Sequence, residues 1–299
     1  MVLASLSWGV LPRPAVAVDA VSALGRLEPV NGVIRVSPPL TERSISGAVV
    51  SRLLADTGDD VAAGQLLAVM ETESVMLAGV AQAEAEYQLA LKQAEQQRSR
   101  AGAACVEARV AERESARRAA LLEKGVAGQE EAEVAAGQAE SLAASCAAAQ
   151  SAIAVAEAEV TVATTRIEHQ RAELQRSYVY APVTGRILKI TTQPGEMAAL
   201  EGIFLLGEVQ QMVAVAEVYE TDIRRVQPGH KASISSAALP AVLHGVVRRI
   251  RPLVAKQDVI ATDPAAHKDA RIIEVEIALD DSSSVADLTY LQVDVLIKP

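Results

Sequence analysis

The sequence predicts an elongated α+β fold, in which a long antiparallel helical hairpin interrupts one small β-domain and a small β-barrel domain follows. Three observations carry this prediction. Residues 74–177 contain no Pro and are dominated by Ala, Glu, Gln and Arg, which favour helices. Two glycine-containing segments of matching spacing flank this helical region. Residues 209–299 alternate apolar and polar side chains, as antiparallel strands do.

Composition excludes several classes of protein. The chain has 299 residues, 28 Lys and Arg against 38 Asp and Glu, a net charge of −10 and only 2% aromatic residues, which argues against nucleic-acid binding. Two Cys and four scattered His cannot build a disulfide framework or a spaced zinc site. Ala is the excess residue, with 18 of its 56 copies in residues 101–150. That density indicates helices packed at short range.

Residues 1–20 form the first segment. An apolar stretch from Val2 to Leu11 precedes the small-residue run Ala15-Val16-Ala17, which is typical of a secretory signal. No basic residues precede the stretch, so the segment is either the remnant of a signal or membrane anchor, or a disordered leader. We favour the remnant. Either interpretation places the rest of the chain outside the cytoplasm.

The helical region, residues 74–177, has one break, at Gly125 and Gly128. Glycine ends a helix by adopting positive φ, so the break predicts two arms of about 50 residues, each about 75 Å long at ~1.5 Å per residue. A dimerising coiled coil is the alternative, but a turn midway favours an antiparallel pair within one chain.

Each arm has an apolar seam at coiled-coil spacing, and the strict seven-residue repeat predicts a left-handed supercoil. The first-arm seam has charged interruptions, while the second-arm seam alternates large and small residues. The predicted first-arm seam is Leu77, Val80, Glu84, Tyr87, Leu91, Ala94, Arg98, Ala101 and Cys105. The predicted second-arm seam is Leu142, Cys146, Ala149, Ile153, Ala156, Val160, Ala163, Ile167, Gln170 and Leu174.

The two cysteines lie on these seams. Cys105 and Cys146 are equally distant from the turn, so the hairpin brings them to the same height on opposite arms. They are either bridged, as an oxidising compartment allows, or two small buried thiols. The sequence leaves both possibilities open.

Residues 41–73 and 178–208 flank the hairpin and share a glycine pattern. Each half has a short apolar strand, a glycine turn, a second glycine and another apolar strand. Glycines recur where turns require positive φ. The turn residues are Gly47, Gly58 and Gly64 in the first half, and Pro182, Gly185, Gly195 and Gly202 in the second.

Two such half-motifs split by a long hairpin resemble the lipoyl-like domain of the HlyD type of periplasmic adaptors, the membrane-fusion proteins. In biotin and lipoate carriers the halves meet at a modified Lys, but the junction here reads Met70-Glu71-Thr72-Glu73-Ser74. Carrier chemistry needs that amine. The resemblance therefore implies a platform without a cofactor.

The C-terminal part, residues 209–299, is similar to the family's β-barrel with a minimal membrane-proximal part, joined by the strand segment 21–40. Residues 263–280, with the segments near both ends of the chain, resemble the DevB-like branch of ABC exporter adaptors. The dispersed His residues and the polar loop before residue 271 give no catalytic or metal site.

The resemblance implies a periplasmic adaptor attached to the inner membrane, not an enzyme. It would link an inner-membrane ABC transporter to a TolC-like outer-membrane channel as a homo-oligomer, commonly a hexamer, and export a lipid or glycolipid. The family's docking motif at the hairpin tip carries Arg, Leu and Ser; here Arg117 and Leu121 match, and Gly128 stands at the Ser position. Adaptors of drug or metal pumps, and less strongly biotin or lipoyl carriers, are the alternatives.

Overall fold

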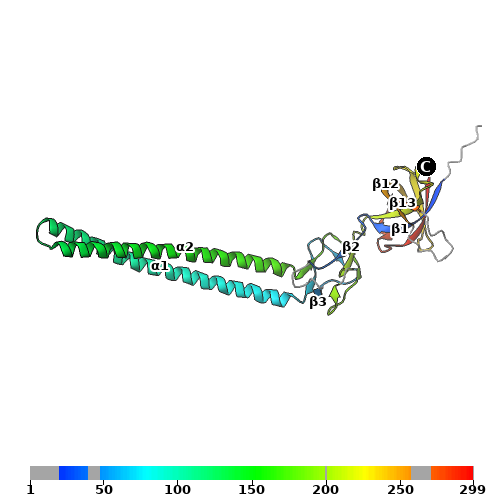
Figure 1. The fold of residues 1–299 in the computed structure, drawn as a ribbon. Helices are drawn as coiled ribbons and strands as arrows, with labels where there is room; N and C mark the ends of the chain where they lie inside the picture. Colours follow the sequence, from blue (N-terminus) through cyan, green and yellow to red (C-terminus); the bar gives the residue numbers. More distant parts are fainter. Residues whose placement is uncertain (1–19, 40–47, 199–200, 257–270, 299) are drawn as a thin grey trace, which may run out of the picture.

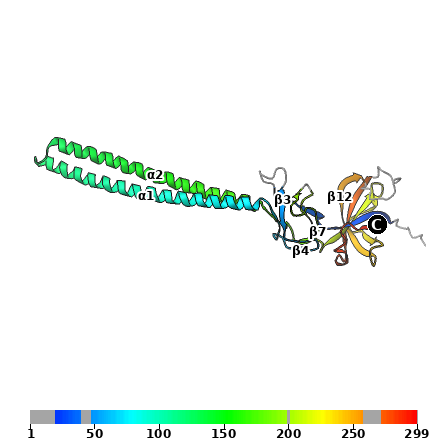
Figure 2. The same cartoon turned by 90° about the horizontal axis from the view of Figure 1, so that it is seen from below.

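A computed structural model describes residues 20–39, 48–198, 201–256 and 271–298 as an elongated molecule with three parts in line (Figures 1 and 2). The helical hairpin occupies one end, a small β-domain lies in the middle, and a β-barrel forms the other end. Residues 1–19 and Gly47, which the sequence placed in the leader and the first half-motif, lie outside the described residues. The same is true of residues 263–270, the first part of the DevB-like segment 263–280.

The hairpin consists of α1, Glu73–Glu123, and α2, Gln129–Gln175. The predicted turn is confirmed, because Gly125 has a φ of +70° directly after α1. The Gly125 N–H donates to the Leu122 carbonyl at 2.8 Å and the Val126 N–H to the Leu121 carbonyl at 2.9 Å. These two bonds satisfy carbonyls at the end of α1 and reverse the chain.

The seam of α2 is confirmed, since its predicted residues are the less exposed ones along the helix and Ala156 is buried. The predicted seam of α1 is wrong in part. Leu77 is 48% exposed, and Glu84 and Arg98 are exposed too. The residues of α1 that are buried are Met76, Ala83, Ala90, Ala94, Ala101 and Ala108.

The correction has a physical reason. Alanine contributes little to a hydrophobic periodicity, whereas Leu77 and Leu91 contribute strongly. The pattern therefore placed the seam on the row of side chains that contains the leucines, next to the row that is buried. A row of buried alanines instead lets the two helix backbones approach closely, and Ile153 and Ile167 on α2 are half-buried. The close approach, more than side-chain size, decides which row faces the partner.

The small β-domain combines strands from both sides of the hairpin. One four-stranded sheet has the order β2-β9-β7-β4 and the other β6-β5-β3-β8. Phe204, Leu67 and Ile187 are fully buried between them. The strands are β2 Val33–Val36, β3 Ala48–Leu53, β4 Asp60–Val61, β5 Leu66–Met70, β6 Tyr178–Tyr180, β7 Gly185–Ile190, β8 Met197–Ala198 and β9 Phe204–Gly207.

The two halves of this domain make reciprocal hydrogen bonds. The Gly58 N–H donates to the Ile187 carbonyl at 2.8 Å, and the Gly195 N–H donates to the Val50 carbonyl at 2.8 Å. Ile187 and Val50 in turn donate to the residues after Gly58 and Gly195. The halves are therefore related by an internal twofold arrangement, as their matched glycine spacing predicts.

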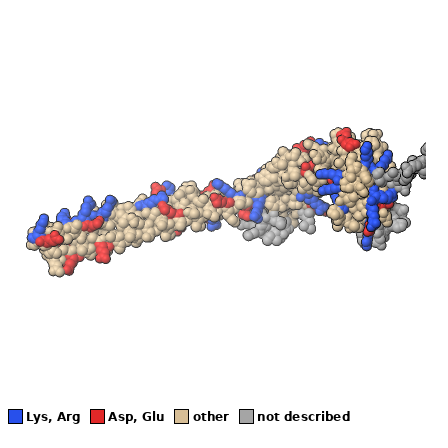
Figure 3. Space-filling view, turned by 90° about the horizontal axis from the view of Figure 1, so that it is seen from above, with Lys and Arg blue, Asp and Glu red and all other residues tan. Residues whose placement is uncertain are grey.

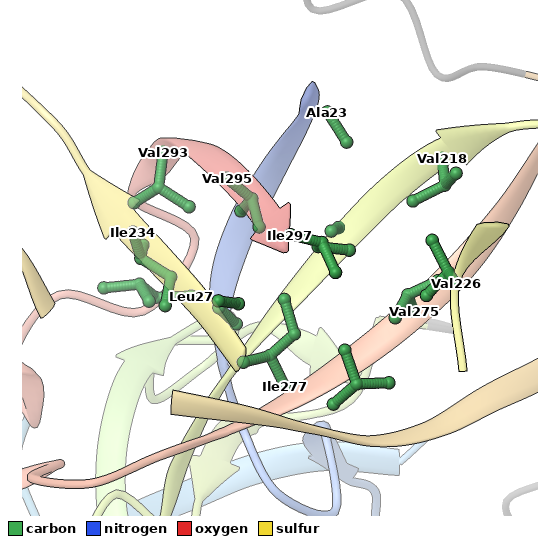
Figure 4. Packing of buried hydrophobic residues seen from close by; sticks show 14 of the residues in the cluster. Ala23, Leu27, Val218, Val226, Ile234, Val275, Ile277, Val293, Val295 and Ile297 are labelled. Carbon is green, nitrogen blue, oxygen red and sulfur yellow. The ribbon is translucent and has the colours of Figure 1, made fainter. Parts of the chain in front are cut away.

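The barrel is closed, with the strand order β1-β10-β13-β12-β11-β14. Its core contains Leu27, Ile234 and Ile277, all fully buried (Figure 4). Strand β1 comes from the segment before the small β-domain and pairs with β10 and β14, so the closed sheet has no free edge. The strands are β1 Val21–Pro29, β10 Met212–Tyr219, β11 Lys231–Ser235, β12 Leu243–Lys256, β13 Arg271–Leu279 and β14 Gln292–Lys298. Two short 3-10 helices are η2, Ile223–Arg225, and η3, Ser283–Val285.

Ion pairs cover the outside of the barrel wall. Arg26 on β1 reaches Glu217 at 3.0 Å and Glu274 at 2.6 Å, and Arg251 also pairs with Glu274 at 2.5 Å. Burial by itself would lower the pKa of the Arg26 guanidinium, but hydrogen bonds to Glu274 and Glu28 outweigh this effect and raise it. The same bonds from Arg26 and Arg251 outweigh the desolvation of Glu274 and lower its pKa.

Candidate docking site on the hairpin

The base of the hairpin is fixed to the small β-domain by polar contacts. The Thr72 and Ser177 hydroxyls lie 2.9 Å apart, and the Met70 N–H donates to the Ser177 carbonyl at 2.9 Å. Arg52 pairs with Glu73 at 3.3 Å across the start of α1. Ser177 is fully buried, so these bonds are shielded from water and set the direction in which the hairpin leaves the domain.

Four ion pairs join the two helices along the flanks of the seam. Each links an Arg on one helix to a Glu on the other at 2.8 to 3.2 Å, and the pairs run from the base almost to the tip. They are exposed, so each stabilises the hairpin by less than about 1 kcal/mol, but together they fix the register of the arms. The pairs are Glu84–Arg171, Glu86–Arg166, Arg98–Glu157 and Arg118–Glu131.

A disulfide joins Cys105 of α1 to Cys146 of α2, with a Cα–Cα distance of 4.7 Å. Buried Ala101 and Ala108 lie one turn of the seam before and after Cys105, and their small side chains allow this approach. The bond closes a loop with a sequence separation of 41 residues that contains the whole tip. The tip residues are therefore carried on a cross-linked pair of helices.

The tip residues proposed from the sequence lie close together but differ in exposure. Arg117 exposes 69% of its side chain and forms an ion pair with Glu114 of its own helix. Leu121 is half-buried, one turn further along the same face of α1. Gly128 is the N-cap of α2 and has no side chain that could accept the first N–H groups of that helix.

Sequence reasoning missed two features of the tip. Arg118, next to the residue singled out, bridges to Glu114 at 2.9 Å and across the turn to Glu131 at 3.2 Å. Val126 is 73% exposed between the two glycines of the turn, and Val134 is 66% exposed on the first turns of α2. An apolar residue in a glycine-rich turn is the signal that could have revealed this patch.

The outer faces of the two arms carry different side chains (Figure 3). On α2, the residues Val134, Ser141, Ala148, Val155 and Val162 recur every seven positions and are all exposed. No Lys or Arg occurs between Gln129 and Thr165, so the charges of this stretch are all acidic. The tip half of α1 is rich in Arg instead. The hairpin thus has a basic edge and an acidic edge, with an uncharged stripe beside the acidic one.

The turn glycines of the small β-domain fall into two groups. Gly58, Gly64, Gly195 and Gly202 all have positive φ, between +78° and +95°, as the sequence predicts. Gly185 differs, because it lies in strand β7, where an added Cβ would be 2.5 Å from the Gly207 carbonyl oxygen. Its small size is required by close strand packing and not by a turn. Pro182 lies in the exposed loop before β7.

The described residues contain few side chains arranged to bind a metal ion or to carry a covalent cofactor. Within them, no group of three or more His, Cys, Asp or Glu could hold a metal ion. The junction where a carrier would present its modified Lys is occupied by the start of α1. Lys124 ends α1 at the opposite end of the hairpin, and Lys189 lies within strand β7.

No model of a known protein family matches this chain, and no curated protein matches it. Solved structures do. MacA from Actinobacillus actinomycetemcomitans is 18% identical, with 93% of this chain and 78% of MacA covered at a TM-score of 0.57. The membrane fusion protein Spr0693 from Streptococcus pneumoniae R6 is 13% identical, with 93% and 98% covered at 0.53.

The chain has the fold of a membrane fusion protein. ZneB from Cupriavidus metallidurans agrees, with 16% identity, 93% of this chain and 98% of ZneB covered, and a TM-score of 0.51. Because the matches cover 93% of the chain, they include the hairpin and both β-domains.

Proposed function

We propose that this protein is the periplasmic adaptor of a tripartite export system. It is attached to the inner membrane, contacts an inner-membrane ABC transporter, and reaches a TolC-like outer-membrane channel with its hairpin tip. The shared fold with a membrane fusion protein supports the adaptor role. The resemblance to the DevB-like branch of HlyD-type adaptors supports the ABC transporter and a lipid or glycolipid as cargo.

The observation that carries the proposal is the tip itself. Two helices of 51 and 47 residues present an exposed cation, Arg117, close to the half-buried Leu121 and the exposed Val126, at the point of the molecule farthest from the barrel. An exposed guanidinium donates hydrogen bonds to a partner, and an exposed apolar knob packs between partner helices. Gly128 lacks the hydroxyl that the family's Ser offers to the channel. Under this proposal, it contacts the channel through its backbone.

The edges of the hairpin support assembly of several copies, commonly six, side by side. By the register of the disulfide, Arg109 and Arg117 of α1 lie at heights close to those of Glu140 and Glu133 of α2, and all four side chains are exposed. In a ring, the basic edge of one copy meets the acidic edge of the next at the same height. The uncharged stripe of α2 permits close packing between them.

The proposed function involves no chemistry on a substrate. The lipoyl-like domain acts as a rigid platform, because the junction that would carry a cofactor amine is Met70 to Ser74 without a Lys. A biotin or lipoyl carrier is the least supported alternative. A covalent cofactor mass on the purified chain would establish it.

The tip assignment is tested with Arg117→Asp and Leu121→Asp in cells that depend on the exporter. We expect export to be lost, because each change removes a tip contact, while circular dichroism shows an unchanged helical content. Arg100→Asp and Leu89→Asp are the matched controls, since both residues are exposed on α1 farther from the tip. Export that survives both tip variants would overturn the docking site.

The transporter class is tested separately by purification of the wild-type protein from membranes. An ABC transporter that co-purifies with it, together with bound lipid, supports the proposal. A pump of another class in its place would establish the alternative of a drug or metal efflux adaptor.

A further inference from the structure

Cations gather at one end of the barrel although the chain as a whole is acidic. The barrel end away from the small β-domain is where β1 begins at Val21, β13 begins at Arg271 and β14 ends at Lys298. Figure 3 shows Lys and Arg side chains gathered at this end of the molecule. The net charge of the protein is −10, so this basic end is a local departure from the average.

The strand register at this end places like charges opposite each other. Lys231 at the start of β11 pairs directly with Lys298 at the end of β14, and both side chains are exposed. Like charges at directly opposed positions destabilise a sheet. The fold by itself gives no reason for this pair.

The cations at this end lack the partners found elsewhere on the barrel. Along the wall, Arg26 and Arg249 each reach a carboxylate. Within the described part of the chain, Lys231, Arg271 and Lys298 form no ion pair. We therefore define the basic barrel end as Lys231, Arg271 and Lys298.

Acidic residues of the loop after β10 lie near the basic barrel end. Asp222, in the loop after β10, pairs with Arg225 at 3.0 Å and not with the basic barrel end. Glu220 lies in the same loop, and its N–H donates to the Arg271 carbonyl at 3.1 Å. Within the described residues, none of the three cations is held in an ion pair that an anionic partner would have to break.

Exposed apolar side chains lie near Arg271 on the strands that flank β13. Leu253 is 71% exposed and Val254 is 49% exposed near the end of β12, where Val254 is aligned with Ile273. Tyr219, aligned with Ile272, is 44% exposed. Cations next to apolar and aromatic side chains fit the boundary of a bilayer, where phosphates and acyl chains are within reach of one surface.

We propose that the basic barrel end binds the anionic phospholipid headgroups of a membrane directly. The apolar stretch from Val2 to Leu11 belongs to the segment that precedes β1, and β1 enters the barrel at this same end. The barrel end that would meet the bilayer is therefore the end at which the chain enters β1. This inference depends on charge and register in the barrel, and it holds whether or not the hairpin tip binds an outer-membrane channel.

The test is co-sedimentation of the full-length protein with phospholipid vesicles. Vesicles containing phosphatidylglycerol are compared with vesicles of phosphatidylcholine alone. We expect the phosphatidylglycerol vesicles to bind more strongly and to release the protein as salt is raised. The variant K231Q/R271Q/K298Q should bind these vesicles about 100-fold more weakly, because three cations near an anionic surface are removed.

A matched variant, K92Q/R100Q/K189Q, removes the same charge from exposed positions outside the barrel. It keeps residues 1–20 and the basic barrel end, so we expect it to bind as the wild type does. A thermal melt of K231Q/R271Q/K298Q should show an undiminished midpoint, because the substitutions relieve like-charge repulsion.

Three results would overturn the proposal. Equal binding of K231Q/R271Q/K298Q and the wild type would show that these cations do not face the lipid. An equal loss in K92Q/R100Q/K189Q would show that only net charge matters. Release by inorganic phosphate, but not by chloride at the same ionic strength, would show a site for free phosphate ions and not a membrane surface.

Discussion

The hairpin and the barrel hold their elements together in opposite ways. Along α1 the buried side chains from Ala83 to Ala108 are all alanines, so each layer of the hairpin removes little apolar surface from water. The barrel buries Leu27, Ile234 and Ile277 completely inside a closed sheet. Because the seam buries little apolar surface, the hairpin depends on further interactions for its stability. These are the ion pairs between the helices and the disulfide. The barrel is stable through its own core.

The comparison predicts that a core cavity in the barrel has the largest effect. We expect Ile277→Ala to lower the free energy of unfolding of the barrel by about 2–5 kcal/mol, through lost burial and the cavity left behind. Leu253→Ala, at a residue 71% exposed, is the control and should change it by less than about 0.5 kcal/mol. Hydrogen exchange measures the protection of the backbone amides in α1 and in the barrel separately. Equal loss of protection in α1 and in the barrel would contradict the separation drawn here.

Removal of the disulfide tests the second half of the comparison. We expect Cys105→Ala together with Cys146→Ala to destabilise the hairpin by about 2–4 kcal/mol, because the closed loop restricts the unfolded chain. Faster hydrogen exchange between residues 105 and 146 is the measurement. The barrel serves as the internal control and should exchange at its wild-type rate. If hydrogen exchange between residues 105 and 146 does not change, the packed seam and the ion pairs are sufficient to stabilise this part of the hairpin without the disulfide.

A larger side chain in the seam tests whether the hairpin is stabilised by close packing of the two helices or only by the helix propensity of alanine. Ala101→Leu places a bulky group where α1 is buried against α2, and we expect a loss of about 1–3 kcal/mol from overpacking. Ala103→Leu adds the same group at an exposed position two residues away. Thermal unfolding followed by circular dichroism compares them. If Ala101→Leu is as stable as Ala103→Leu, the helices are not closely packed there.

The smallest effect concerns acid stability of the barrel wall. Hydrogen bonds from Arg26 and Arg251 hold the pKa of Glu274 below its usual value of 4.5. A carboxyl with a depressed folded-state pKa stabilises the protein above its unfolded pKa, and this contribution is lost as the pH falls through the folded value. We expect about 1 kcal/mol or less.

Chemical denaturation of Glu274→Gln at neutral pH and below pH 4.5 measures this contribution. The stability difference from the wild type should shrink in acid. Glu123→Gln, at an exposed residue at the end of α1, should show no such change. A constant difference for Glu274→Gln at both pH values would contradict the assigned role of the network.

Much of the site was predictable because it depends on local rules. The absence of Pro from residues 74–177, the Gly125 turn and the α2 seam follow from helix propensity, positive φ and a seven-residue repeat. The placement of Cys105 and Cys146 at one height follows from the position of the turn. The matched glycine spacing anticipated the reciprocal bonds of Gly58 and Gly195.

The tertiary structure decided the features that depend on which surfaces meet. The seam of α1 runs through Ala83 and Ala94, and not through Leu77, because backbone approach outweighs side-chain size where alanines face each other. Gly185 is required by its closeness to Gly207, which is distant in sequence. The pairing of Lys231 with Lys298 arises only when β11 and β14 become neighbours in the closed barrel. Sequence periodicity reflects the conformational preference of each helix or strand by itself. The residues that each element contacts depend on pairing between segments that are distant in the sequence.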